Sequence, residues 1–336
     1  MSLFQQRTAK QALVALTFGL LTLLMAACGS APATTASGSA SDPSVAPQIQ
    51  TTPNGYHFTT LDNQADPTFN QLLGINNNGV IAGYFGSGAT GHPNMGYTLT
   101  HPYGQANYTN ENFPGSAQTQ VTAINQHGQT AGFWVDANGN NFGFILWKGH
   151  FTSYTDPNTG KGTVNQLLGL NDSGYAVGFY TDANGLNHAY KLNRHNGHFT
   201  AIVPPDSTQA VATGITDDGA ITGFLTLANG NTLGFLLRGK TFTEFSFTDS
   251  TNTMPFGINK YNQIVGVYVD AAGKMHGFLV SNVWEHATFL SIDDPDGVGT
   301  TTVNGINDKG QLVGFFVDSA GNTDGFLANP KKDSHK

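Results

Sequence analysis

The feature that most constrains this chain is a unit that repeats six times along the sequence. The phrase Gly-Ile-Asn, or a close variant, has its central Ile or Leu at positions 75, 124, 170, 215, 258 and 306, which are 49, 46, 45, 43 and 48 residues apart. A glycine follows eight residues after each of these positions, and that spacing never varies. Such a period is typical of folds in which small identical units stack on one another.

Each unit reads as four short β-runs separated by turn residues. One unit consists of Phe242–Phe245, Pro255–Ile258, Gln263–Tyr268 and His276–Leu279. The turn Asn-x-x-Gly separates the second and third runs, and Asp-Ala-Asn-Gly or a variant separates the third and fourth. Both turns favour tight hairpins. The sequence therefore predicts a four-stranded antiparallel meander in every unit, which is too small to bury both of its faces alone.

Aromatic residues recur at fixed places in the unit, and we interpret them as packing between neighbouring meanders. One series comprises Tyr97, Phe144, Tyr190, Phe235, Phe278 and Phe326, and a second, which opens the units, comprises Phe58, Tyr108, Phe151, Phe199, Phe242 and Phe289. Four strands per unit and six units predict an all-β fold, a six-bladed β-propeller.

The order of the strands predicts how the ring closes. The last strand of a unit lies close in sequence to the opening strand of the next, so the two should pair. This leaves an unpaired strand at each end of the domain, Tyr56–Leu61 and Thr323–Ala328. We expect these two strands to pair with Thr59 opposite Leu327 and to close the ring. The alternative is an open β-solenoid, whose ends would lie far apart.

The amino terminus predicts export. Arg7 and Lys10 precede an uncharged apolar run that ends in Leu-Met-Ala-Ala before Cys28, the only cysteine of the chain. This pattern resembles a bacterial lipobox, which implies that Cys28 is lipidated and anchors the protein to the cell envelope, at the outer membrane or the outer face of the cytoplasmic membrane. The alternative is an ordinary secretory signal with a chance cysteine.

The expected organisation has four parts. Residues 1–27 form the signal peptide, 28–53 the lipidated cysteine and a flexible linker, 54–329 the repeat domain, and 330–336 a polar tail. Without Arg7 and Lys10 the chain has 12 basic and 22 acidic residues, a net charge near −10. That balance disfavours nucleic acid or an anionic bilayer as a partner.

The repeat also resembles a known family. The pattern Phe-Thr-x-x-Asp-x-Pro, Gly-Ile-Asn-x-x-Gly, Ile-Val-Gly-x-Tyr-x-Asp and His-Gly-Phe-Leu is similar to the HAF extracellular repeats of bacterial exported proteins, over about residues 56 to 328. The histidine of that pattern occurs only as His188 and His276. The resemblance implies export and a repetitive β-fold, and carries over no catalytic residues.

Several aspartates are expected on one face of the propeller. Turns between the third and fourth runs contain Asp136, Asp182, Asp270 and Asp318, and the loops that enter the next blade contain further aspartates, among them Asp156 and Asp294. In an up-and-down blade these turns and loops lie at the same end of the strands. The carboxylates could bind Ca²⁺ or cationic groups, or they could serve as ordinary turn residues.

The asparagines of the repeat phrase leave two interpretations open. Asn76, Asn125, Asn171, Asn259 and Asn307, with Thr216, could line a central channel, or each could cap its own hairpin turn. The histidines show no zinc-like spacing, and His188 and His276 have no common ligand set around them.

The sequence predicts a binding or scaffold module without catalytic residues. It has no Gly-x-Ser-x-Gly, His-Glu-x-x-His or phosphate-loop motif. No cofactor is required, and the expected partners are the membrane, through Cys28, and an extracellular protein or glycan. One alternative is a propeller hydrolase or lyase that acts on glycans through the acidic face, and another is a purely structural envelope protein.

Overall fold

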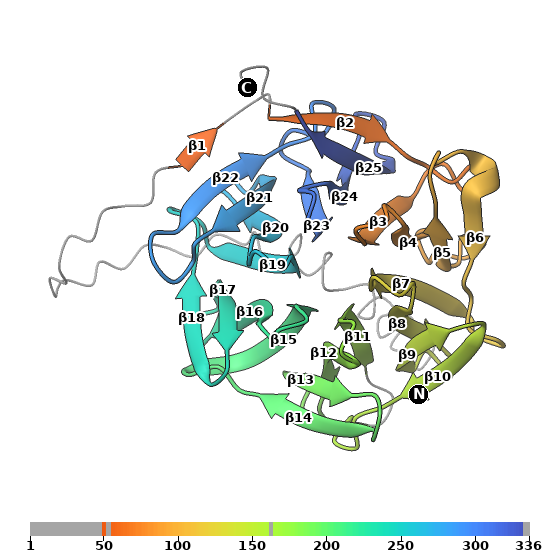
Figure 1. Ribbon diagram of the computed structural model, residues 1–336, viewed down its shortest axis with the longest axis horizontal. Coiled ribbons are helices and arrows are strands. Elements are labelled where there is room, and N and C mark those ends of the chain that lie inside the picture. Colours follow the sequence, from red (N-terminus) through yellow and green to blue (C-terminus); the bar gives the residue numbers. More distant parts are fainter. Residues whose placement is uncertain (1–48, 52–54, 161–163, 332–336) are drawn as a thin grey trace, which may run out of the picture. The chain divides into compact units, whose positions relative to one another are not determined.

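The computed structural model describes residues 49–51, 55–160 and 164–331, which form strands and one short 3-10 helix, η2 (Gln105–Asn107) (Figure 1). The all-β expectation is confirmed. Among the residues described, no helix is long and apolar enough to cross a membrane. The expected signal peptide, Cys28 and most of the expected linker lie outside the described residues, so those predictions stay predictions.

The strands follow one another in groups of four, which we call sets. The first set is β3 (Asn70–Ile75), β4 (Ile81–Phe85), β5 (Met95–Leu99) and β6 (Tyr108–Asn110). The next are β7 (Gln118–Ile124), β8 (Thr130–Val135), β9 (Asn141–Trp147) and β10 (His150–Tyr154), then β11 (Asn165–Leu170), β12 (Tyr175–Thr181), β13 (Asn187–Asn193) and β14 (His198–Ile202). They are followed by β15 (Ser207–Ile215), β16 (Ile221–Leu227), β17 (Thr232–Arg238) and β18 (Thr241–Phe245), then β19 (Asn252–Ile258), β20 (Ile264–Val269), β21 (Met275–Ser281) and β22 (Thr288–Ile292). The closing set is β23 (Thr302–Ile306), β24 (Leu312–Val317), β25 (Thr323–Pro330) and the early strand β2 (Tyr56–Thr60).

Strand pairing gives four separate four-stranded sheets and one nine-stranded sheet. In the larger sheet, one bridge between Thr232 and Asn252 joins β17 to β19 and so connects two antiparallel sets. Its ninth strand is β1 (Ile49–Thr51), which runs parallel to β22. The sequence predicted a flexible linker at these residues and not a strand. Because the pairing itself gives five sheets, the count of six blades stays a prediction.

The ring closes through the strand that the sequence predicted. Strand β2 pairs antiparallel with β25, and Thr59 lies opposite Leu327. Figure 1 shows β2 lying along β25, although the two strands come from opposite ends of the domain. This pairing excludes the open solenoid. It also gives each of the two strands a partner along the edge that would otherwise be exposed and would favour aggregation.

A β-bulge beside each invariant glycine explains why the glycine spacing is fixed. In β7 the register shifts between Val121 and Ala123, which makes Thr122 the extra residue. A Cβ on Gly132, in β8, would lie 2.0 Å from the carbonyl oxygen of Gln120. The equivalent distances to the neighbouring carbonyl oxygen at Gly83, Gly178, Gly223, Gly266 and Gly314 are 2.3, 1.9, 2.1, 2.1 and 2.0 Å. Only glycine allows this close backbone approach.

The first series of aromatic residues covers these glycines from the third strand. Gly132 pairs directly with Phe144, and Gly314 pairs with Phe326. The six side chains are fully buried: Tyr97, Phe144, Tyr190, Phe235, Phe278 and Phe326. A ring placed over a glycine on the next strand fills the space that the missing side chain leaves. Each ring also belongs to an apolar cluster with side chains of the preceding set, so the predicted packing between neighbouring units is confirmed for this series.

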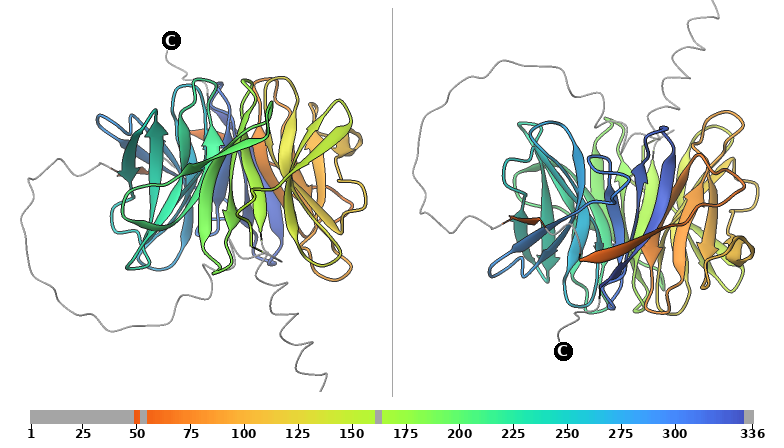
Figure 2. Two further views of the ribbon diagram at one scale, coloured as in Figure 1. Left: turned by 90° about the horizontal axis from the view of Figure 1, so that it is seen from below. Right: turned by 90° about the horizontal axis from the view of Figure 1, so that it is seen from above.

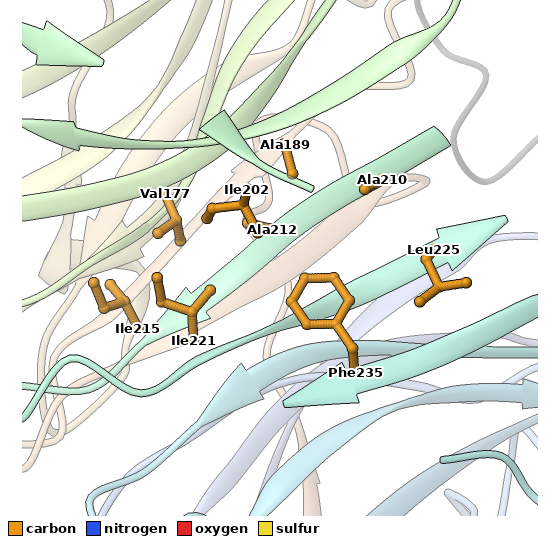
Figure 3. Packing of buried hydrophobic residues seen from close by; sticks show 9 residues of the cluster. All are labelled: Val177, Ala189, Ile202, Ala210, Ala212, Ile215, Ile221, Leu225 and Phe235. Carbon is orange, nitrogen blue, oxygen red and sulfur yellow. The ribbon is translucent and has the colours of Figure 1, made fainter. Parts of the chain in front are cut away.

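Apolar side chains from neighbouring sets meet between them. Figure 3 shows one such cluster, in which residues of β11–β14 pack against residues of β15–β18. Its members are Val177, Ala189, Ile202, Ala210, Ala212, Ile215, Ile221, Leu225 and Phe235. Each set therefore depends on its neighbours to remove its apolar surface from water.

The turns lie at the two ends of the strands and form two faces of the ring, seen edge-on in Figure 2. The turns between the first and second strands of each set contain the repeat asparagines, from Asn76 to Asn307, and we call that end the asparagine face. The turns between the second and third strands contain Asp136, Asp182, Asp270 and Asp318 in four of the sets, and that end is the aspartate face. The loops that connect one set to the next also lie on the aspartate face.

Candidate functional site

The four turn aspartates lie on the aspartate face, as the strand order predicted, and each one holds its own turn. Oδ1 of Asp136 accepts the backbone N–H groups of Asn138 at 2.8 Å and Asn140 at 2.9 Å. Asp182, Asp270 and Asp318 accept the same two backbone hydrogen bonds in their turns. Turn chemistry therefore accounts for one oxygen of each carboxylate.

The second oxygen binds a side chain next to the turn. Nε2 of His188 lies 3.1 Å from Oδ2 of Asp182. The backbone N–H of Leu186 and the side chain of His188 lower the pKa of Asp182 to about 2. His276 lies 3.4 Å from Asp270 through Nε2 and 2.9 Å from Asp293 through Nδ1. The histidines of the repeat pattern therefore connect a turn carboxylate to the body of the sheet.

The loop aspartates Asp156 and Asp294 are buried, and each holds its own loop. Oδ1 of Asp156 accepts the backbone N–H of Asn158 at 2.9 Å, and Oδ1 of Asp294 accepts that of Asp296 at 3.0 Å. Burial raises the pKa of Asp294, whose Oδ2 has no hydrogen-bond partner within the described ranges. In those ranges no three His, Cys, Asp or Glu side chains are arranged to hold a metal ion. Binding of Ca²⁺ by these carboxylates stays a prediction.

Three carboxylates gather in the closing set. Asp318 occupies the turn, Asp324 follows at the start of β25, and Asp62 comes just after β2. The position of Asp324 is that of His276 in the preceding set. Burial, followed by the charges of Asp324 and Asp318, raises the pKa of Asp62 to about 6, although a hydrogen bond from the N–H of Gly325 opposes the shift.

Charged side chains divide between the two faces. Among the residues that the structure describes, every Lys and Arg except Lys274 lies on the asparagine face or at the strand end beside it: Lys148, Lys191, Arg194, Arg238, Lys240, Lys260, Lys309 and Lys331. The acidic residues there are Asp172, Asp217, Asp218, Glu285 and Asp308. Glu111 is half-buried between β5 and β8, where its carboxylate accepts hydrogen bonds from Thr98 and Thr130, and the other described Asp and Glu lie on or next to the aspartate face. The net charge of the chain thus averages a strongly acidic face and a weakly basic one.

The repeat asparagines cap their turns and also join neighbouring sets. Oδ1 of Asn76 accepts the backbone N–H groups of Asn78 and Val80, both at 3.0 Å, so the predicted capping role is confirmed there. The amide nitrogen of the same side chain donates to the backbone carbonyl of Asn125 in the next set at 3.0 Å. The other inter-set bonds run from Asn125 to Asn171, from Asn171 to Thr216, from Asn259 to Asn307 and from Asn307 to Asn76, at 3.2, 2.9, 3.2 and 3.0 Å.

This ring of hydrogen bonds has one gap. Thr216 has no amide group to donate toward Asn259. A second series of inter-set hydrogen bonds, made by the residue after each repeat asparagine, is interrupted at the same junction. In this series a backbone N–H donates to a side-chain oxygen in the next set, as Lys260 does to Oδ1 of Asp308 at 3.1 Å. The Lys260 side chain has no oxygen that could accept the N–H of Asp217. The junction between β15–β18 and β19–β22 therefore lacks both side-chain bonds that other junctions have.

The axial cavity is narrow and lined by the bulged residues of the first strands, which sequence reasoning did not identify. Its volume is about 80 Å³, and the bulged residues that line it are Leu73, Thr122, Leu168, Thr213, Phe256 and Asn304. The hydroxyls of Thr122 and Thr213 donate to the carbonyls of Leu167 and Pro255 in the next set, at 2.8 and 3.0 Å. Pockets for organic ligands usually measure ~300–1,000 Å³, so this cavity is too small for one.

A larger pocket opens at the rim of the ring, between β17–β18 and the loop after β21. Leu236, Arg238, Thr241, Thr243 and Trp284 line it, and its volume is about 270 Å³, close to the lower end of the range for ligand pockets. Trp284 is 41% exposed, and the guanidinium carbon of Arg238 lies 4.9 Å from its ring centroid. An exposed indole, a guanidinium and two hydroxyls can bind a ligand by stacking and hydrogen bonding.

Solved structures similar to this chain share its architecture. A TolB-like protein of Agrobacterium tumefaciens superposes with a TM-score of 0.55 at 12% identity, covering 79% of this chain and 92% of that one. TolB of Acinetobacter baumannii superposes with a TM-score of 0.50 at 12% identity, covering 74% of this chain and 63% of that one. The fold is a β-propeller. An Aleuria aurantia lectin mutant, in complex with Fucα1-6GlcNAc, covers 80% of this chain and 98% of its own at 12% identity, with a TM-score of 0.49.

No family model matches this propeller, and no curated protein matches its sequence. At 12% identity the structural likeness concerns the fold alone. Any ligand of the rim pocket must therefore be inferred from the residues that line the pocket. Sequence reasoning missed it because Arg238 and Trp284 come from different repeats, although Trp284 is one of only three tryptophans.

Proposed function

We propose that this chain is a lipid-anchored envelope protein whose propeller is a non-enzymatic binding module, and that the rim pocket is its ligand site. The observation that carries the proposal is the combination of Trp284, Arg238, Thr241 and Thr243 around one open pocket. An extracellular glycan suits this chemistry, because a sugar presents an apolar face to an indole and hydroxyls to polar groups.

The turn carboxylates support a binding role over a catalytic one. Both oxygens of Asp136 and of Asp318 accept hydrogen bonds inside their turns. Asp182 and Asp270 bind their turn backbone and a histidine. A catalytic carboxylate needs a free oxygen within reach of the substrate, and these four aspartates are occupied.

The ligand proposal is tested with the full-length chain, solubilised in detergent, on an array of extracellular glycans. We expect one group of glycans to bind, and Trp284→Ala to lower that affinity at least tenfold because the stacking platform is lost. Trp147→Ala is the matched control, since Trp147 is also a partly exposed indole but lies outside the pocket. Equal loss in both variants, or no glycan binding at all, would contradict a glycan ligand at this pocket.

The lipid anchor and export are proposed from Cys28 and the preceding run, and membership of the HAF repeat family from the repeat pattern. In the native host, radiolabelled palmitate should enter the wild type and not Cys28→Ser, which should move to the soluble fraction. Ser30→Ala is the control and should keep the label. Absence of label in the wild type would contradict the anchor while leaving the ligand proposal intact.

A glycan hydrolase or lyase is the second candidate function, and one observation favours it. Asp62, with a pKa of about 6, lies near Asp324, which is not one of the four occupied turn aspartates, and glycosidases use a pair of carboxyl groups of which one donates a proton. Release of reducing ends from a bound glycan, abolished by Asp62→Asn, would establish this activity. Binding of the glycan without cleavage would contradict the hydrolase or lyase and support the binding module.

A further inference from the structure

Within the described ranges, the exposed Trp and Tyr side chains all lie on the asparagine face of the propeller, which is weakly basic. Trp147, Tyr261 and Trp284 are 37, 60 and 41% exposed, and all three belong to turns or strand ends of the asparagine face. A cation lies over each ring: Lys148 over Trp147 at 5.2 Å, Lys260 over Tyr261 at 5.0 Å and Arg238 over Trp284 at 4.9 Å. Aromatic rings paired with Lys or Arg are typical of protein surfaces that meet a lipid headgroup layer.

These residues are spread across the face. Trp147 ends β9, whereas Tyr261 and Trp284 belong to the β19–β22 set. In Figure 1, β9 and β21 lie on opposite sides of the ring. A small ligand could not reach both sides of the ring, so a partner that engages all three residues must be broad.

The chain enters and leaves the domain on the same face. Strand β2 begins there at Tyr56, and β25 ends there at Pro330. Residue Ile49 of β1 pairs with Phe289, at the beginning of β22, which also lies toward the asparagine face. Both ends of the described domain therefore lie on the asparagine face.

We propose that the asparagine face docks on the anionic lipid surface to which the chain is anchored, with the aspartate face directed away from it. This inference rests on the proposed lipid anchor for its setting. The negative net charge of the chain disfavoured an anionic bilayer as a partner. It does not describe the asparagine face, because the acidic residues are concentrated on the opposite face. A six-residue strand spans about 20 Å, whereas the Debye length at physiological salt is about 8 Å, so the acidic face is screened from the bilayer.

A lipid surface suits the face better than a soluble polyanion. The acyl anchor would hold the propeller at high effective concentration near the bilayer. A weakly basic patch is then enough to set its orientation, since an acyl chain and a basic patch act together in membrane binding. The basic side chains are least offset by acidic ones over β7–β14, where the asparagine face has Lys148, Lys191 and Arg194 against Asp172 alone among the described residues.

The three tryptophans provide a direct test of this orientation, because Trp134 lies toward the aspartate face and the other two lie on the asparagine face. The lipidated full-length chain is placed in vesicles of phosphatidylcholine, with or without phosphatidylglycerol, that contain brominated lipid. A variant that keeps only Trp147 should be strongly quenched in anionic vesicles, and one that keeps only Trp134 should not. Equal quenching of the two, or no quenching of Trp147, would overturn the proposal.

Charge variants separate the basic face from the anchor. Lys148→Gln, Lys191→Gln and Arg194→Gln together should lower the quenching of Trp147 several-fold, and added salt should do the same. Lys274→Gln is the matched control, because Lys274 is the described Lys on the aspartate face. Unchanged quenching in the triple variant, with an unchanged melting temperature, would also overturn the proposal.

The unlipidated Cys28→Ser chain makes the test independent of acylation. It should sediment with phosphatidylglycerol vesicles more than with phosphatidylcholine vesicles, and the triple variant should lose that preference. If the chain is not acylated in its host but still shows this preference, the anchor fails and the docking face stands. If the basic face binds polygalacturonate and neither vesicle, the docking proposal fails and the face belongs to an acidic polysaccharide.

Discussion

At the residue scale, the repeat asparagines show how one side chain can serve both a turn and an interface. The capping bond of Asn76 follows from its own turn, so the sequence predicts it. The bond from its amide nitrogen to Asn125 depends on where the next set lies, and no pattern within one repeat reports that distance. The exception, Thr216, is visible in the sequence, but its consequence, a gap in the ring, appears only in the structure.

Thr216→Asn should close this gap. The new Oδ1 would take over the cap on the N–H of Ala220, which Thr216 now holds at 3.0 Å, and the amide nitrogen would donate to the carbonyl of Asn259. One added neutral hydrogen bond contributes about 1 kcal/mol, and loss of the bond that the Thr216 hydroxyl donates to the exposed Asp218 carboxylate offsets part of this gain. The free energy of unfolding in urea should therefore rise by less than about 1 kcal/mol. Asn171→Thr, the reverse change, should lower it. A loss of stability in Thr216→Asn would show that the junction cannot accept the bond.

At the element scale, the closing strand carries an electrostatic penalty at its end. Asp62 follows β2, and its Oδ1 accepts the N–H of Gly325 at 3.0 Å, which helps to hold β2 on β25. The folded chain raises its pKa from 3.8 to about 6, so the folded state binds more protons than the unfolded state between those values. Its contribution to stability is therefore most favourable below the unfolded pKa and is lost as the pH rises through the folded one.

Asp62→Asn should raise the melting temperature at about pH 8 and leave it nearly unchanged at about pH 4. Asparagine keeps the acceptor for Gly325 and removes the charge. Asp182→Asn is the control of opposite sign: its folded pKa of about 2 means that its contribution is present above the unfolded value and lost as the pH falls, so this variant should melt lower at about pH 8. Equal shifts in both variants would rule out the buried charge as the cause.

The elements also show where sequence reasoning ends. The constant distance from the Gly-Ile-Asn phrase to the next glycine predicted a hairpin, and β7 and β8 form it. The bulge at Thr122, which makes that glycine obligatory, was not predicted, because a bulge residue may be Leu, Thr, Phe or Asn and leaves no pattern. The aspartate face followed from strand order alone. The rim pocket did not, since its residues come from two repeats.

At the scale of the whole molecule, ring closure turns a linear array into one cooperative body. Each set buries its apolar surface against its neighbours, so an open ring would expose the surface of its two end sets. Strand β2 and the bond from Asn307 to the carbonyl of Asn76 join the two ends. The sequence predicted the strand because one was left over at each end, and it could not predict the asparagine bond.

A disulfide across the seam should lock the ring. His57 and Asn329 are Cα partners in the β2–β25 pair, and replacing both with cysteine in a Cys28→Ser background should give an intramolecular cross-link under mild oxidation. These positions suit the test better than Thr59 and Leu327, because Leu327 is buried. The oxidised protein should melt several degrees higher than the reduced one, since the bond closes a loop of nearly the whole domain.

The control pair is Thr60 and Asn329, which are out of register because Thr60 lies opposite Phe326. Cysteines at these two positions should stay reduced. Cross-linking of the control pair at the same rate, or only between molecules, would contradict closure by β2.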